Sequence, residues 1–168
     1  MDIYIIKTSC AENIPDKLLS QYQYKNFSSA QKKQEHTLSY LMLHKILENV
    51  YGISEIDIEF INQKPFLKHR KKYFSISHSK EFIAIAISDY NCSIDIEKVK
   101  TRDYISISKR MGFNSNSLDE FYRQWTMFEA EYKLNEKPKS AQIIDLNEYK
   151  ASALSVNSQE KFDIYIQN

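Results

Sequence analysis

The chain has 168 residues, of which 42% are hydrophobic, enough for one ordinary domain or for two small halves that share a core. Its formal net charge of +1 argues against a broad electrostatic attraction to nucleic acid or to an anionic membrane. It contains only two glycines and no glycine-rich phosphate loop, so a bound nucleotide would have to be held by side chains.

The sequence carries no pattern of export or membrane insertion. The opening residues MDIYIIKTSC have too short an apolar run for a signal peptide, and no stretch reaches the ~20 apolar residues of a membrane span. Cys10 and Cys92 fit neither a disulfide framework nor a metal motif, and we interpret them as reduced thiols. We therefore expect a cytoplasmic protein that binds neither membranes nor nucleic acid.

The first half of the chain predicts one long helix among strands. The helix spans residues 28–50, with Ser28 or Ser29 as its N-cap and Gly52 as its end. Residues 62–67 (NQKPFL), with Pro65, predict a turn. Alternating or β-branched runs predict strands at residues 2–7, 55–61, 72–79 and 81–89, the last two forming a hairpin.

The second half of the chain also predicts one long helix among strands. Residues 93–99 (SIDIEKV) predict a strand, residues 102–111 a short helix and residues 117–135 a long helix. Three alternating runs close the chain, at residues 142–146, 150–156 and 161–167. The predicted apolar stripe of the long helix consists of Leu118, Phe121, Tyr122, Trp125, Phe128 or Glu129, and Tyr132.

We therefore predict an α+β fold made of two similar α/β halves, residues 1–90 and 91–168. Each half would hold a long helix and a three-stranded antiparallel-type sheet, and the two would form one compact unit. No sequence repeat is visible to support a duplication.

Paired acids on one strand are the first candidate site. In SIDIE, Asp95 and Glu97 point to one face while Ile94 and Ile96 point to the other. Two adjacent like charges repel unless a positive charge lies between them or water surrounds them, so a solvated edge strand is the simpler interpretation. Glu129 lies within the apolar stripe of the last helix, where a carboxylate needs a partner, and this favours a positive ion bound between the acids. Three carboxylates are a ligand set suited to Mg²⁺.

Basic and polar side chains could complete an anion site. Lys133 follows Glu129 by one helical turn, where such a pair is commonly a surface ion pair, but beside a metal it could neutralise a reacting phosphate. Ser77 and His78 lie at a strand end and Lys64 precedes Pro65 in a turn. Taken singly, His78 and Lys64 are ordinary structural or surface residues.

Four motifs in this order resemble those of the Sfp-type 4′-phosphopantetheinyl transferase family. They are QKPFL (63–67), FSISHS (74–79), SIDIEK (93–98) and WTMFEAEYKL (125–134). The resemblance implies two α+β halves related by pseudo-twofold symmetry, with the active site between them. It also implies Mg²⁺-dependent transfer of the 4′-phosphopantetheine arm of coenzyme A to a serine of an acyl or peptidyl carrier protein, releasing adenosine 3′,5′-bisphosphate. Such holo-carrier-protein synthesis serves fatty acid, polyketide or nonribosomal peptide biosynthesis.

The resemblance assigns roles to individual positions. Asp95, Glu97 and Glu129 match the metal ligands, and Lys133 matches the lysine that contacts the reacting phosphate, so that Asp95, Glu129 and Lys133 form the catalytic set. Ser77, His78 and Lys64 match contacts to the phosphates of coenzyme A, and Lys33, with Lys32, loosely matches the basic residues that open the first helix. The duplicated halves would let a monomer form a complete site.

Three positions depart from the family pattern. Phe128 replaces a lysine, Ser93 replaces a glycine, and Asn116 stands where members often carry a glutamate, for which Asp119 or Glu120 are the nearest substitutes. These departures leave two alternatives open. One is a weak or inactive relative that binds coenzyme A or a carrier protein without transfer, and the other is an unrelated Mg²⁺-dependent phosphohydrolase.

Overall fold

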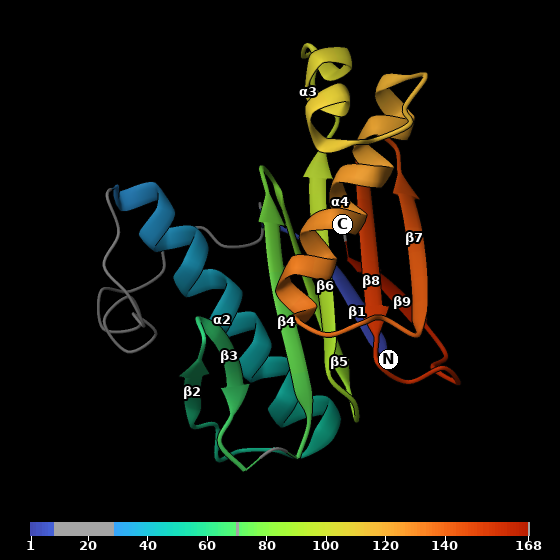
Figure 1. Ribbon diagram of the computed structural model, residues 1–168. Helices are drawn as coiled ribbons and strands as arrows, with labels where there is room; N and C mark the ends of the chain where they lie inside the picture. Colours follow the sequence, from blue (N-terminus) through green and yellow to red (C-terminus); the bar gives the residue numbers. More distant parts are fainter. Residues whose placement is uncertain (9–28, 70, 168) are drawn as a thin grey trace.

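The computed structural model describes residues 1–8, 29–69 and 71–167 (Figure 1). Within them it has the α+β architecture expected from the sequence, with helices packed on two main sheets. The predictions made for Cys10 and for Ser28 as an N-cap lie outside the described residues.

The first sheet has the strand order β4-β5-β1-β9. Its strands are β1 (Asp2–Lys7), β4 (Tyr73–Ser79), β5 (Phe82–Ser88) and β9 (Asp163–Gln167). The β4–β5 hairpin is antiparallel as predicted, whereas β9 comes from the end of the chain and pairs in parallel with β1. The last strand of the second half thus lies in the sheet of the first, where Ile164 lies beside Ile3 and Ile166 beside Ile5. The prediction of a three-stranded antiparallel-type sheet in each half is therefore wrong for the first half, whose sheet has four strands and one parallel pair.

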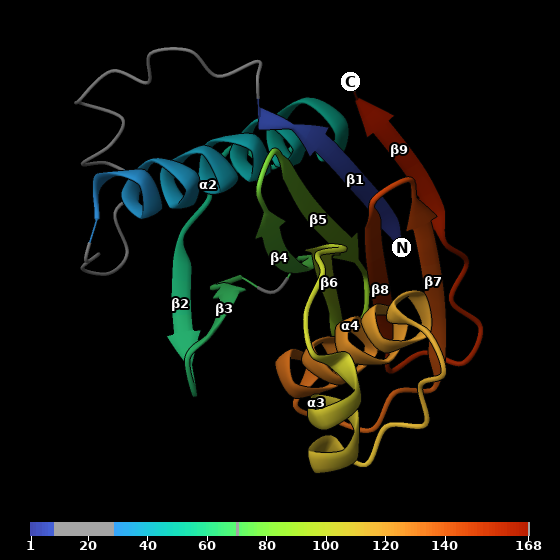
Figure 2. The same cartoon turned by 90° about the horizontal axis from the view of Figure 1, so that it is seen from above.

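Helix α2 (Ala30–Tyr51) covers one face of this sheet (Figure 2). The Ser29 side chain accepts a hydrogen bond from the Lys32 amide, and the helix ends at Gly52, whose φ of 64° is the left-handed conformation that glycine adopts most easily. Leu43 and Leu47 are fully buried in the cluster that packs on the sheet, which confirms the predicted helix and its end.

A small hairpin follows α2, formed by β2 (Ile58–Ile61) and β3 (Lys64–Leu67). The prediction of a turn over residues 62–67 is wrong in extent, because only Asn62 and Gln63 form the turn and Pro65 lies within β3. Both turn residues have positive φ, 50° and 68°, as the commonest two-residue hairpin turn requires. Pro65 is tolerated because this hairpin is a two-stranded sheet.

The second sheet has the order β6-β8-β7 and is antiparallel throughout. It contains β6 (Cys92–Lys98), β7 (Ser140–Leu146) and β8 (Tyr149–Ser155), with α3 (Tyr104–Met111) between β6 and helix α4 (Leu118–Leu134). Ile94 and Ile96 of β6 are buried in one cluster with Ile3 and Ile5 of β1, so the two sheets share a core.

Helix α4 packs on β6 and β8 through a stripe that agrees with the predicted one at Phe121 and Tyr122 and differs from it further along the helix (Figure 1). The residues buried in the helix are Phe121, Tyr122, Thr126, Ala130 and Leu134. Tyr132 is 79% exposed, so its predicted place in the stripe is wrong. Small residues at positions 126 and 130 let the helix approach β8 closely enough for Thr126 Oγ1 to hydrogen-bond Ser152 Oγ at 2.8 Å.

Strands β4 and β6 lie side by side and connect the two sheets through side chains. The hydroxyls of Ser75, Ser77 and Ser79 accept hydrogen bonds from the backbone amides of residues 94, 96 and 98, at 3.1, 3.3 and 3.0 Å. These amides lie on the side of β6 away from β8, so the serines satisfy donors that a neighbouring strand would otherwise satisfy. We call this row of three serines the serine seam.

Candidate active site

A cavity of about 350 Å³ opens where β4, β6 and α4 meet. Ile76, Ser77, His78, Asp95, Glu97, Trp125, Glu129 and Lys133 line it. The structure therefore brings together six of the residues that the sequence singled out, from three separate elements.

Helix α4 supplies one wall of the cavity through residues spaced one turn apart. Trp125, Glu129 and Lys133 follow at intervals of four and share a helix face, next to the stripe that packs on β8. Glu129 is half-buried there, as expected for a carboxylate beside an apolar stripe. Among the described residues Lys133 forms no ion pair with Glu129, so the simple surface pair expected from their spacing is not formed.

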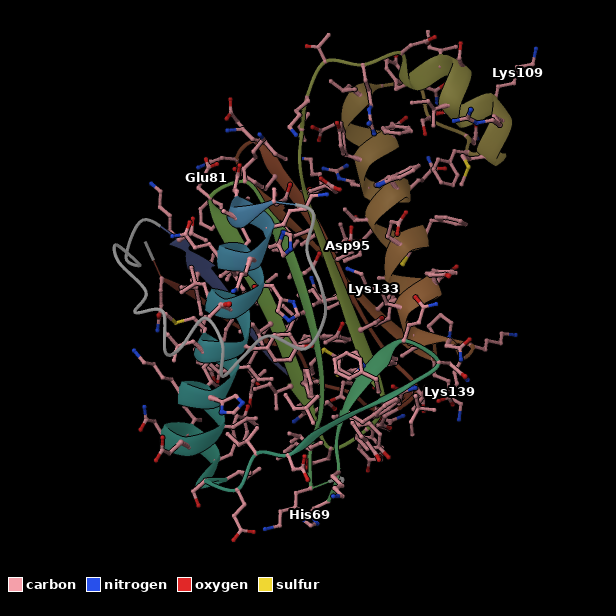
Figure 3. The ribbon with its side chains drawn as sticks, turned by 90° about the vertical axis from the view of Figure 1, so that its left-hand side faces the viewer. His69, Glu81, Asp95, Lys109, Lys133 and Lys139 are labelled. Atoms are coloured by element: carbon pink, nitrogen blue, oxygen red, sulfur yellow. The ribbon has the colours of Figure 1, made fainter. Side chains whose placement is uncertain are left out.

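Lys133 pairs instead with Asp95 across the cavity (Figure 3). Its ammonium lies 2.7 Å from Asp95 Oδ1 and also donates to Ser77 Oγ and to the Ile94 carbonyl. The Asp95 side chain is 8% exposed and the Lys133 side chain 31% exposed. Asp95 Oδ2 is buried and has no hydrogen-bond partner within the described residues.

Glu97 has a different environment from that of Asp95. Ser79 donates a hydrogen bond to Glu97 Oε2 at 3.0 Å. Burial raises the pKa of Glu97, and the neighbouring Asp95 charge raises it further, against the opposing effect of the Ser79 hydrogen bond. The surroundings of Glu97 therefore disfavour its charged form, and a positive charge in the adjoining cavity would favour it.

The other predicted contacts lie at different distances from the cavity. His78 lines it, and its Nδ1 is 4.0 Å from Glu35 Oε2 of α2. Lys33 is half-buried in the first turn of α2, two residues before Glu35, and is not part of the lining.

Lys64 also lies outside the lining. Its ammonium donates to Asn91 Oδ1 at 2.5 Å and to the carbonyls of Cys92 and Leu134, at the start of β6 and the end of α4. Burial lowers the pKa of Lys64. In this structure the lysine ties β3 to the second sheet.

The donor set of the cavity suits a divalent cation, although its carboxylates are not gathered around one point. Asp95, Glu97 and Glu129 offer hard oxygen atoms, and the unpartnered Asp95 Oδ2 is a buried acceptor that a cation would satisfy. In the described part of the chain, however, no three acid, histidine or cysteine side chains come close enough to hold a metal. The chemistry thus fits Mg²⁺, and a site made of all three carboxylates would require Glu97 and Glu129 to move toward Asp95.

Comparison with known proteins agrees with the motifs. The chain is 29% identical over 147 residues to a protein of Aneurinibacillus migulanus named 4′-phosphopantetheinyl transferase gsp. The match covers 76% of this chain and 61% of that protein, so the chain spans less than two thirds of its relative's length. The chain is thus similar in sequence to a protein that is named as a 4′-phosphopantetheinyl transferase. No protein-family model matches it.

Two departures from the phosphopantetheinyl transferase pattern are visible next to the cavity. Phe128, at the position of the family lysine, is 40% exposed and lies against Phe113 and Trp125, with ring centroids 6.0 and 6.4 Å away. Ser93 is fully buried in β6 and is not among the positive-φ residues, so its backbone does not require glycine.

The acids considered as substitutes at the third departure, Asn116, already have partners. Glu120 accepts a hydrogen bond from the Asn116 amide at 2.6 Å. Asp119 forms ion pairs with Arg123 and with the buried Lys150.

None of the helices that the structure describes is long and apolar enough to cross a membrane.

The serine seam is the part of the site that sequence reasoning missed. Ser77 was assigned from the resemblance as a coenzyme A contact, and the seam as a whole was not predicted. The alternation of serine with larger residues in FSISHS places all three hydroxyls on one side of β4. That spacing was the available signal, although it does not reveal which strand lies beside β4.

Proposed function

We propose that this protein transfers the 4′-phosphopantetheine arm of coenzyme A to a serine of an acyl or peptidyl carrier protein, in a Mg²⁺-dependent reaction. The main support is the cavity, in which residues from all but one of the four family motifs meet. The relative named 4′-phosphopantetheinyl transferase supports the same reaction class.

The position of the cavity supports the proposed organisation in two halves. Its lining comes from β4, in residues 1–90, and from β6 and α4, in residues 91–168. An active site between two pseudo-symmetric halves would be lined by residues from both of them. If the two halves of one chain form a complete site in this way, a monomer is sufficient for activity, and that is what we expect.

The reaction would exchange one phosphorus–oxygen bond for another. The carrier serine oxygen bonds to the phosphorus that bears the pantetheine arm, and the bond from that phosphorus to adenosine 3′,5′-bisphosphate breaks. Lys133, whose ammonium now donates to Asp95 Oδ1, Ser77 Oγ and the Ile94 carbonyl, would exchange at least one of these acceptors for an oxygen of the reacting phosphate. We assign Glu129 to accept the serine proton, since it forms no ion pair among the described residues.

Asp95, Glu97 and Glu129 are the residues that we expect to hold Mg²⁺. When bound, the ion would neutralise charge on the pyrophosphate and ease departure of the bisphosphate. His78 and Ser77 border the same space, where the resemblance expects the phosphates of coenzyme A.

Binding without transfer remains the second candidate, and the observation that favours it is Phe128. A phenylalanine supplies no positive charge where other family members carry lysine, and its ring is occupied by packing on Phe113 and Trp125. Such a protein would need the phosphate contacts but not Glu129.

The deciding experiment is intact mass spectrometry of apo acyl and apo peptidyl carrier proteins incubated with this protein, coenzyme A and Mg²⁺. We expect a gain of one phosphopantetheine that is lost in EDTA and in Asp95→Ala. The control is Lys139→Met, which changes an exposed lysine outside the cavity. No gain on either carrier, with coenzyme A still binding by calorimetry, would replace the transferase proposal by the binding one.

A further inference from the structure

The side-chain hydroxyl of Ser77 has no hydrogen-bonding capacity left for a ligand. Its hydroxyl accepts from the Ile96 amide at 3.3 Å and from the Lys133 ammonium at 3.1 Å. Its single proton goes to Asp95 Oδ1 at 2.9 Å, because a carboxylate can only accept. The oxygens of a phosphate accept hydrogen bonds, so the Ser77 hydroxyl could bind a phosphate only if its proton no longer went to Asp95.

The neighbouring serines show which part of this arrangement is specific to the site. Ser75 is equally buried and accepts from the Ile94 amide at 3.1 Å, but it contacts no acid in the described structure. Ser79 accepts from the Lys98 amide and donates to Glu97. All three serines therefore hold the two sheets together, and two of them also hold an acid of the cavity.

As a consequence, the two carboxylate oxygens of Asp95 differ in their hydrogen-bond partners. Oδ1 receives hydrogen bonds from Ser77 and Lys133, while Oδ2 is buried without a partner within the described residues. A carboxylate held through one oxygen cannot rotate freely, so its other oxygen keeps a fixed direction. Outer partners of this kind set the orientation of the ligands that hold metals in proteins.

We infer that Ser77 is a positioning residue that fixes Asp95 so that Oδ2 is presented to a divalent cation, and that it does not itself bind coenzyme A. The inference rests on the proposed function for the presence of the cation. It differs from the role that the family resemblance suggests for this serine, which is direct contact with the phosphates.

The test compares Ser77→Ala with Ser75→Ala, which removes the same kind of seam hydrogen bond without touching an acid. Calorimetry of coenzyme A is carried out in EDTA and in Mg²⁺, and binding of Mn²⁺ alone is followed by electron paramagnetic resonance. We expect Ser77→Ala to match Ser75→Ala in coenzyme A affinity in EDTA. In the metal experiments we expect Ser77→Ala to bind Mn²⁺ about tenfold or more weakly than Ser75→Ala. We expect the gain in coenzyme A affinity on adding Mg²⁺ to be smaller by the same factor.

Three results would overturn the inference. An equal loss of coenzyme A affinity in EDTA and in Mg²⁺ would mean that Ser77 contacts the ligand directly. Equal Mn²⁺ affinities for the two variants would mean that the serine only joins the sheets. A wild-type protein that binds no divalent cation would remove the basis of the role.

Failure of the proposed function would give a different pattern. A wild type that binds Mn²⁺ but not coenzyme A would refute the transferase, while the comparison of Ser77→Ala with Ser75→Ala on Mn²⁺ would still decide the role of Ser77. Thermal melts of both variants show whether each is folded at the temperature of the titrations.

Discussion

Replacing Lys133 by methionine should destabilise the protein through Asp95, even in the absence of any ligand. The variant leaves a carboxylate whose side chain is only 8% exposed, with Ser77 as its remaining hydrogen-bond donor. Removing one partner of a fully buried ion pair costs about 3–5 kcal/mol, whereas exposed pairs contribute about 0–1 kcal/mol. Because Lys133 is 31% exposed, water can partly replace it, and we expect a loss of about 2–3 kcal/mol.

The loss should be specific to the pair, which a double-mutant cycle with Asp95→Asn measures. In Asp95→Asn the ammonium of Lys133 can turn toward the open cavity, so that single change should cost about 1 kcal/mol. The double variant should be little worse than Lys133→Met alone, which corresponds to a coupling of about 0.5–1 kcal/mol.

Urea denaturation in EDTA without coenzyme A is the appropriate assay, because a bound ligand would add its own stabilisation. For a chain of this size the expected loss corresponds to a fall in melting temperature of about 4–12 °C. Lys139→Met is the control for loss of an exposed lysine and should change stability by less than about 0.5 kcal/mol. Strictly additive effects of the two changes would refute the pairing on which the geometry of Asp95 rests.

Three further predictions concern other parts of the chain. Phe128→Lys should raise transfer measured by mass spectrometry, and should lower stability by about 1–2 kcal/mol in melts, since two ring contacts are lost. Lys64→Met should lower the free energy of unfolding in urea by about 1–3 kcal/mol, because three acceptors each lose one donor, of which the Leu134 carbonyl keeps a second from Asn91. The hydrogen bond from Arg123 lowers the pKa of Asp145, so the advantage of wild type over Asp145→Asn should be present above pH 3.8 and disappear as the pH falls through the lowered value in acid titrations.

The fold follows from the sequence where local signals act alone. The N-cap Ser29, the helix end at Gly52 and the alternation of SIDIE all predict what the structure contains. The buried stripe of α4 agrees with the sequence pattern at Phe121 and Tyr122 but continues through the small residues Thr126 and Ala130 rather than through large apolar ones. Hydrophobic periodicity gives weight to large side chains and therefore selected Tyr132, which is exposed.

The pairing of strands from distant parts of the chain could not be predicted. The alternation that identifies β9 as a strand is the same whichever strand it pairs with, and its partner β1 is known only from the folded chain. The same limit applies to the serine seam, since a serine that faces an unpaired amide looks in sequence like any exposed serine. Six residues of the cavity lining could be predicted from the motifs, whereas Lys33 and Lys64 lie outside it and the partners of each residue could not be predicted.

The two adjacent acids of β6 now have a physical explanation that does not depend on a bound ion. Each acid receives a hydrogen bond from its own seam serine, and Asp95 also receives the ammonium of Lys133. These contacts offset part of the repulsion between the carboxylates, but burial and Asp95 still raise the pKa of Glu97. The strand can therefore fold with both acids in place, and the charge that remains uncompensated is the property that would draw a divalent cation to Asp95 Oδ2.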